Sequence, residues 1–208
     1  MPRVLPESLR AQAAATKGFL PEDEAQALAA AALSAPAGTW LEVGSYCGKS
    51  TIWLGWAAAQ RDSQLVTLDH HRGSEENQPG WEWHDPTLVD VETQRLETLP
   101  HLRRTVWRAH LEDSVSIVVA DTRQAAQWWN SPLTFLFLDG NHTEEVAQHD
   151  YAAFAPFLVP GGVLAVHDVF ENPADGGQPP WHVVQRATGE DGFEQTGRCG
   201  SLRVLRKP

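Results

Sequence analysis

Five acidic residues stand where predicted β-strands end, and this placement is the clearest chemical signal in the sequence. They are Glu42, Asp69, Asp121, Asp139 and Asp168. Because the carboxyl ends of parallel strands meet at one crevice of an open α/β sheet, these carboxylates are expected to face a common cleft. Such a cleft attracts a cationic ligand and repels phosphates. Aspartate also favours strand exits as a turn former, and that alternative would account for two or three of the five positions.

Alternating strands and helices must position these acids. Short apolar runs predict strands at 39–43, 64–68, 116–120, 133–138 and 163–166. Helical patterns occupy 21–33, 49–60, 87–112 with a break at Pro100, 124–129, 143–158 and 181–187. Two last strands, 193–198 and 202–206, form a hairpin that turns at Cys199-Gly200. This order predicts an α/β fold with a doubly wound, mostly parallel sheet and a C-terminal antiparallel hairpin.

The first strand runs into a turn, GSYCGKS, from Gly44 to Ser50. A phosphate-binding P-loop has four residues between its first glycine and Gly-Lys, whereas only three separate Gly44 from Gly48. The surrounding acids also have the wrong sign for a nucleoside triphosphate. Asp69 ends the second strand, where α/β cofactor domains bind ribose hydroxyls. S-adenosylmethionine (SAM) suits this site better, because it offers a ribose together with a cationic ammonium and a cationic sulfonium.

The segments EVGSYCGKST, LDGNH and LAVHDV, together with Asp69, resemble the small class I SAM methyltransferases often grouped as family 24. The resemblance covers most of the chain, from about Thr39 to Val169, and implies a Rossmann-like fold with a seven-stranded sheet. It extends to metal-dependent O-methyltransferases that act on sugars in macrolide and methylmannose polysaccharide assembly. Tyr46 stands where many members have the middle glycine of Glu-x-Gly-x-Gly-x-Gly, which makes that motif a moderate signal.

The resemblance also implies how the strand ends would hold the cofactor. Glu42 is expected near the methionine end of SAM, Asp69 on its ribose and the Asp121 region near its adenine. The backbone of the Gly44 turn is expected to approach the cofactor closely. The complete expected cofactor-binding set is Glu42, Gly44, Ser45, Tyr46, Gly48, Ser50, Asp69, His70, Asp121, Thr122 and Asp139.

Asp139-Gly-Asn-His142 and His167-Asp168 form the expected chemical centre. Methyl transfer to a hydroxyl needs its oxygen in line with the sulfonium carbon and its proton removed. Asp139 and Asp168 close adjacent central strands, so both can reach one divalent cation, which would lower the pKa of the hydroxyl. By resemblance, His142 is the expected base and His167 stands where a further acidic ligand is usual. The expected metal ligands are Asp139, His167 and Asp168, with Mg²⁺ or, because of the imidazole, Mn²⁺ as the ion.

Simpler roles also fit some of these side chains. His142 is placed where it would cap the following helix, and His167 where it would hydrogen-bond beside an ion without binding it. Asn141 is either a turn residue or a substrate contact.

Residues 70–86, HHRGSEENQPGWEWHDP, form a long polar segment that we expect to be an active-site loop or lid. Trp81 and Trp83 within it suit stacking on the apolar face of a sugar, or a lid that excludes water. A local hydrophobic anchor for the loop, or a subunit contact, fits the same pair equally well.

The composition argues against several classes of binding partner and location. The net charge of −11 argues against nucleic acid, and the clearest basic cluster, Arg103, Arg104 and Arg108, is typical of a solvated helix face. No apolar run approaches the ~20 residues of a transmembrane helix, and MPRVLPESLR lacks the apolar stretch of a secretory signal. Cys47 and Cys199 make neither a disulfide framework nor a zinc motif, so a cytoplasmic location is expected.

We predict a single domain across residues 1–208, with a helical segment at 1–38, that associates as a homodimer. The leading functional prediction is a SAM- and metal-dependent O-methyltransferase whose acceptor is a small hydroxylated molecule, a mannoside or oligosaccharide. Three alternatives stay open: a catechol or phenol O-methyltransferase, a non-catalytic cofactor-binding domain, and an oxygenase that uses the Asp/His set for iron.

Overall fold

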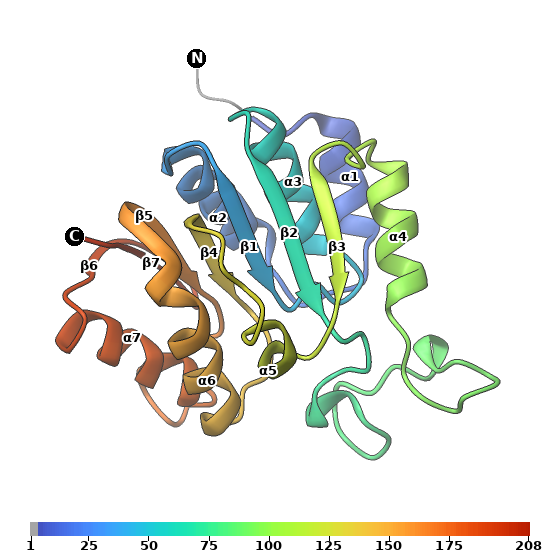
Figure 1. Cartoon of the computed structure of the whole chain (residues 1–208). Helices are drawn as coiled ribbons and strands as arrows, with labels where there is room; N and C mark the ends of the chain where they lie inside the picture. Colours follow the sequence, from blue (N-terminus) through green and yellow to red (C-terminus); the bar gives the residue numbers. More distant parts are fainter. Residues whose placement is uncertain (1–3) are drawn as a thin grey trace.

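A computed structural model describes residues 4–208 and contains one mixed sheet of seven strands (Figure 1). The strands are β1 (Thr39–Val43), β2 (Gln64–Asp69), β3 (Val115–Val119), β4 (Leu133–Leu138), β5 (Leu158–Val166), β6 (Glu194–Cys199) and β7 (Leu202–Arg206). Their order across the sheet is β3-β2-β1-β4-β5-β7-β6. The first five run parallel, and β7 pairs antiparallel with both β5 and β6. This arrangement confirms the predicted doubly wound sheet and its C-terminal hairpin.

Helices cover both faces of the sheet (Figure 1). One face carries α1 (Glu7–Ala15), α2 (Glu22–Ser34), α3 (Lys49–Ala59) and α4 (Leu99–Arg108). The other carries α5 (Thr122–Ala125), α6 (Glu144–Phe154) and α7 (Pro179–Gly189). Three short 3₁₀ turns complete the elements: η1 (Glu75–Asn77), η2 (Pro86–Leu88) and η3 (Ala155–Phe157). Among the described residues no helix is both long and apolar enough to cross a bilayer.

The core lies on both sides of β4, the central strand. All six residues of its sequence LTFLFL are buried, as expected for a strand covered by helices on both faces. On one side Phe135 meets the ring of Trp40 with centroids 5.5 Å apart. On the other side Trp129 stacks edge-on against Phe154 at 6.0 Å. The ends of the central strands are therefore held rigidly, which favours a well-ordered site beyond them.

Two helices are shorter than the sequence predicts. The region 87–112 is not mostly helical, because α4 begins only at Leu99 and Pro100 lies in its first turn. Proline is tolerated there, since the first helical N–H groups have no intrahelical acceptor. The helix predicted at 143–158 ends at Phe154, and Pro156 directs the chain through η3 into β5, which begins at Leu158.

The helix predicted at 124–129 is displaced toward the N-terminus. It spans Thr122–Ala125 because Asp121 caps it, accepting a hydrogen bond from the Arg123 N–H at 2.8 Å.

The segment between β2 and α4 extends beyond the carboxyl ends of the parallel strands (Figure 1). It is anchored by Leu88 and Leu96, which pack with Cys47 in a small apolar cluster.

Gly44 allows the turn after β1 to lie against the end of β4. Its φ is +86°, and a Cβ at this position would sit 2.2 Å from the carbonyl oxygen of Asp139. Both the left-handed backbone and the close approach exclude larger residues. The turn after β1 and Asp139 of LDGNH are thereby brought into direct contact.

Candidate active site

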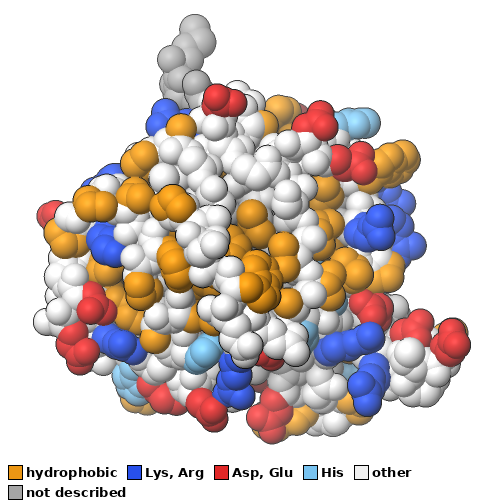
Figure 2. All heavy atoms as spheres, in the orientation of Figure 1, with side chains coloured by type: hydrophobic (Ala, Val, Ile, Leu, Met, Phe, Trp, Pro, Cys, Tyr) orange, Lys and Arg blue, Asp and Glu red, His pale blue; other side chains and the backbone are white. Residues whose placement is uncertain are grey.

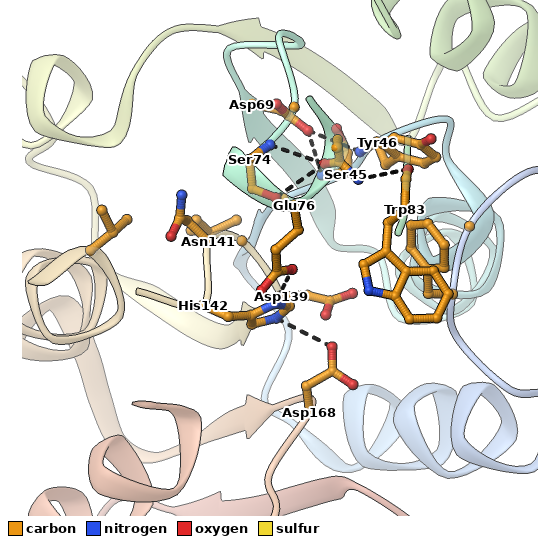
Figure 3. Close-up of a pocket in the computed structure, with 18 of the residues that line it drawn as sticks. Ser45, Tyr46, Asp69, Ser74, Glu76, Trp83, Asp139, Asn141, His142 and Asp168 are labelled. Carbon is orange, nitrogen blue, oxygen red and sulfur yellow. Dashed lines mark hydrogen bonds and ion pairs between the residues drawn. The ribbon is translucent and has the colours of Figure 1, made fainter. Parts of the chain in front are cut away.

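A cavity of about 860 Å³ opens at the carboxyl ends of β1, β2, β3 and β4 (Figure 3). Nine of the residues expected to bind a cofactor line it: Gly44, Ser45, Tyr46, Ser50, Asp69, His70, Asp121, Thr122 and Asp139. Glu42 and Gly48 do not. The convergence of strand-end residues on one cavity follows from the parallel topology, and ligands of open α/β sheets bind at such an edge.

Asp69 organises the turn after β1. Its Oδ2 accepts hydrogen bonds from the N–H groups of Ser45 (3.0 Å) and Tyr46 (2.9 Å), and its Oδ1 accepts one from His71 (2.7 Å). A carboxylate has about four acceptor positions, so one remains for a further donor in the cavity. The main role that the structure gives Asp69 is thus to hold the turn, which residue spacing alone did not indicate.

Glu42 lies beneath the turn and not in the cavity. It is fully buried, and its two carboxyl oxygens accept hydrogen bonds from Ser50 Oγ (2.6 Å) and Thr51 Oγ1 (2.7 Å) of α3. The expected position at the methionine end of a cofactor is therefore corrected. The physical reason is register: Glu42 pairs alongside Thr67 and Phe137 within the sheet, one residue before the strand ends. Burial raises the pKa of Glu42 to about 8 despite these hydrogen bonds, with a smaller contribution from Asp139 and Asp69.

We expect Glu42→Gln to remove a pH-dependent loss of stability. The folded-state pKa of about 8 exceeds the ordinary value of 4.5, so the folded chain holds a proton that the unfolded chain releases. Stability is full below pH 4.5 and falls as pH rises to about 8, by roughly 1.4 kcal/mol per pH unit from this group. Urea unfolding at several pH values should show a shallower decline for Glu42→Gln. The exposed Glu112→Gln is the control, and equal slopes for both variants would contradict a buried proton on Glu42.

Asp139, His142 and Asp168 form the chemical cluster (Figure 3). Each offers one ligand atom, and these atoms lie within 4.8 Å of one another. His142 Nε2 lies 3.2 Å from Asp168 Oδ2, and Nδ1 lies 3.3 Å from Glu76 Oε2. Asp168 has a left-handed φ of +53°, which turns the chain sharply at the end of β5. Sequence reasoning did not single out Glu76, since nothing marks it among the polar residues of the 70–86 loop.

The electrostatics of the cluster favour a positive charge among its carboxylates. Burial alone would lower the pKa of His142, but hydrogen bonds with Asp168 and Glu76 and charge attraction from Asp168 and Asp139 raise it to about 10. Burial alone would raise the pKa of Asp168, but interactions with His142 and His167 lower it. The site therefore has the charge balance of a cation-binding cleft.

His167 occupies a different place from the one expected. It is buried behind Asp139, with Nδ1 at 2.9 Å from Asp139 Oδ1 and Nε2 at 2.6 Å from Glu24 Oε2. Both ring nitrogens are engaged, so the three-residue cluster contains His142 instead. Packing of α2 against the end of β5 places Glu24 there. His167 thus lies beside the candidate ion site and not within it, which is the simpler of the two roles that the sequence left open.

Neither His142 nor Asn141 caps α6, whose N-cap is Thr143. Asn141 Oδ1 accepts a hydrogen bond from the Thr143 N–H at 2.7 Å, and the Thr143 side chain makes no capping bond. Asn141 thus closes the turn before the helix, and it also lines the cavity. His142 makes no capping bond to the helix and lines the cavity.

An aromatic group borders the cavity opposite the cluster. Phe19 meets Trp83 edge-on with centroids 5.2 Å apart, and its ring lies 5.6 Å from Tyr46. Trp83 lines the cavity (Figure 3), whereas Trp81 does not. Phe19 and Trp83 are 54% and 48% exposed. Phe19 comes from the segment before α2, far from the motifs, and no pattern in the sequence indicated it.

The sheet order, the glycine turn after β1 and the acids around one cavity define the class I methyltransferase architecture. Residues 41–169 match the family model described as "Methyltransferase domain", the group numbered 24. The chain belongs to this methyltransferase family, which confirms the resemblance at that level.

Solved structures share the fold at low identity. The cofactor-bound protein Rv0187 from MTB is 18% identical with a TM-score of 0.65, covering 96% of this chain and 87% of that one. TomG from Streptomyces achromogenes, an O-methyltransferase of tomaymycin synthesis solved with SAM, is 17% identical with a TM-score of 0.62 and coverages of 99% and 92%. An O-methyltransferase from Bacillus cereus, solved with SAH, is 19% identical with a TM-score of 0.58 and coverages of 97% and 89%.

Proposed function

We propose that this methyltransferase transfers the methyl group of SAM to a hydroxyl of a small acceptor, with a divalent cation held by Asp139 and Asp168 and with His142 as the base. The observation that carries the proposal is the meeting of the Gly44 turn and the Asp139, His142 and Asp168 cluster in one cavity. A cofactor on the turn and an acceptor at the cluster would be neighbours, as an in-line transfer requires.

The residues at the turn fit SAM. Gly44 lets the turn pack against the end of β4 at the cavity wall, and the remaining acceptor capacity of Asp69 suits a ribose hydroxyl. The acidic wall suits the ammonium and sulfonium groups. TomG and the Bacillus cereus enzyme, which share the fold, were solved with SAM and SAH respectively.

The cluster fits a divalent cation, Mg²⁺ or Mn²⁺. Asp139 and Asp168 offer hard oxygen ligands from adjacent strands, and His142 lies within the same small group. When bound, such an ion lowers the pKa of an acceptor hydroxyl and orients it. With the charge of Asp139 and Asp168 balanced by the ion, the imidazole of His142 would be able to accept the hydroxyl proton. Glu76 holds the other ring nitrogen and orients the imidazole.

A sugar, such as a mannoside or oligosaccharide, fits the remaining wall. Trp83 and Phe19 present aromatic surface suited to the apolar face of a pyranose, while Glu82 supplies a carboxylate for its hydroxyls. Acidic and basic side chains alternate around the lower rim of the face shown in Figure 2 without forming a continuous basic surface, which disfavours a nucleic-acid acceptor.

Binding and transfer assays test the function separately. Calorimetry should detect SAH binding to the protein, and radiolabelled SAM should methylate mannosides in the presence of Mg²⁺. An acceptor screen that includes catechols separates the sugar from the phenol alternative. SAH binding without methylation of any acceptor would instead favour a non-catalytic cofactor domain, and no SAH binding together with an iron-dependent spectrum would favour the oxygenase.

A further inference from the structure

A series of buried, hydrogen-bonded side chains connects α2 to the proposed metal site. Glu24 Oε2 of α2 lies 2.6 Å from His167 Nε2, and His167 Nδ1 lies 2.9 Å from Asp139 Oδ1. The same Nδ1 lies 3.5 Å from Asp168 Oδ2. The imidazole of His167 therefore contacts both carboxylates that would bind the ion, and its other ring nitrogen contacts the carboxylate of Glu24.

Glu24 is fixed on its other side by the β6–β7 turn. Its Oε1 accepts a hydrogen bond from the Ser201 N–H at 2.8 Å, and its Oε2 accepts one from Ser201 Oγ at 3.0 Å. The turn can approach only because residue 200 is glycine, since a Cβ there would lie 2.0 Å from Glu24 Oε1. These contacts together hold the Glu24 carboxylate in one orientation.

Burying Glu24 and His167 costs free energy, which indicates that these side chains serve to orient Asp139. The side chains of Glu24 and His167 are 7% and 2% exposed, and desolvating two ionic groups often costs as much as their attraction returns. Apolar residues of similar volume would stabilise this position at least as well. Histidines and carboxylates that touch metal ligands from outside are known to fix the ligands and to tune metal affinity.

We propose that Glu24 and His167 are positioning residues that hold Asp139, and with it Asp168, in the geometry that binds the divalent cation. His167 Nδ1 engages Oδ1 of Asp139, so Oδ2 would be the oxygen left for the ion. Carboxylates face both ring nitrogens, so the imidazole donates from both, through Nε2–H to Glu24 and through Nδ1–H to Asp139. This inference rests on the proposed metal-dependent function, and it assigns the N-terminal helix layer a part in that site.

The test compares two double variants by their Mn²⁺ affinity. In Glu24→Gln/His167→Leu the buried charge is removed, the new glutamine side chain retains an acceptor oxygen for Ser201, and Asp139 loses its donor. In Glu24→Gln/His167→Asn the asparagine amide replaces Nδ1 as the donor to Asp139. We expect the leucine variant to bind Mn²⁺ about 10–100-fold more weakly and the asparagine variant to recover most of the loss. The matched control is Glu22→Gln. Glu22 lies in the same helix as Glu24, but it is exposed and pairs with Arg10 of α1.

SAH affinity and circular dichroism distinguish positioning from folding. Both should match the wild-type protein in all variants, because the turn that would hold the cofactor is not touched. If Glu24→Gln/His167→Leu fails to fold, His167→Gln replaces it, since its amide reaches toward Glu24 and leaves Asp139 Oδ1 without a donor. Equal Mn²⁺ affinity in the wild-type and leucine (or His167→Gln) variants overturns the positioning role alone. A wild-type protein that binds SAH but no Mn²⁺ overturns the metal site and this inference together.

Discussion

His142→Ala is expected to lower kcat for methyl transfer by about 10²–10⁴-fold, the usual contribution of a positioned general base. The imidazole faces the cavity between Asp168 and Glu76 and is not needed to cap α6, so its removal should leave the fold intact. SAH affinity, measured by calorimetry, should change less than about twofold because the Gly44 turn is unaffected. Steady-state kinetics with saturating SAM and Mg²⁺ provide the measurement.

His182→Ala is the matched control, because His182 also pairs with a glutamate, Glu144, but lies exposed on α7. It should retain full activity. Mn²⁺ affinity then separates two roles for His142. A base can be removed with little change in metal affinity, whereas a drop that parallels the loss of kcat would make His142 a metal ligand. Full activity of His142→Ala would contradict both roles, general base and metal ligand.

Asp168→Asn is expected to lower kcat on the order of 10³-fold and to abolish tight Mn²⁺ binding. A Lewis-acid cation supplies several kcal/mol of transition-state stabilisation, and each ~1.4 kcal/mol corresponds to tenfold in rate. Asparagine keeps the shape of aspartate but loses the charge that binds the ion and pairs with His142. The same loss should appear when EDTA is added to the wild-type enzyme, and Mg²⁺ or Mn²⁺ should restore activity.

Asp175→Asn is the control for charge alone. Asp175 lines the same cavity but lies outside the three-residue cluster, so its loss should leave Mn²⁺ affinity unchanged. Activity that is indifferent to EDTA in the wild-type enzyme would remove the cation from the mechanism, whatever Asp168→Asn does.

The sequence by itself determined the architecture and the edge of the sheet where the site lies. Apolar runs of the right length, each ended by a turn former or acid, specified the strands, and their alternation with helices specified the parallel order. Parallel order brings strand ends together, so Asp69, Asp121 and Asp139 had to meet at one cavity. Local periodicity carries this information, because it depends only on neighbours in the chain.

Only the tertiary structure decided which of these side chains face the cavity. Glu42 lies one residue inside the end of β1, where the alternation of side chains in a strand turns it under α3. His167 lies behind Asp139 and outside the cavity lining, where Glu24, 143 positions earlier in the chain, meets its ring. Phe19 reaches Trp83 in the same long-range manner. Contacts of this kind depend on how distant elements pack, and no local pattern in the sequence encodes their partners.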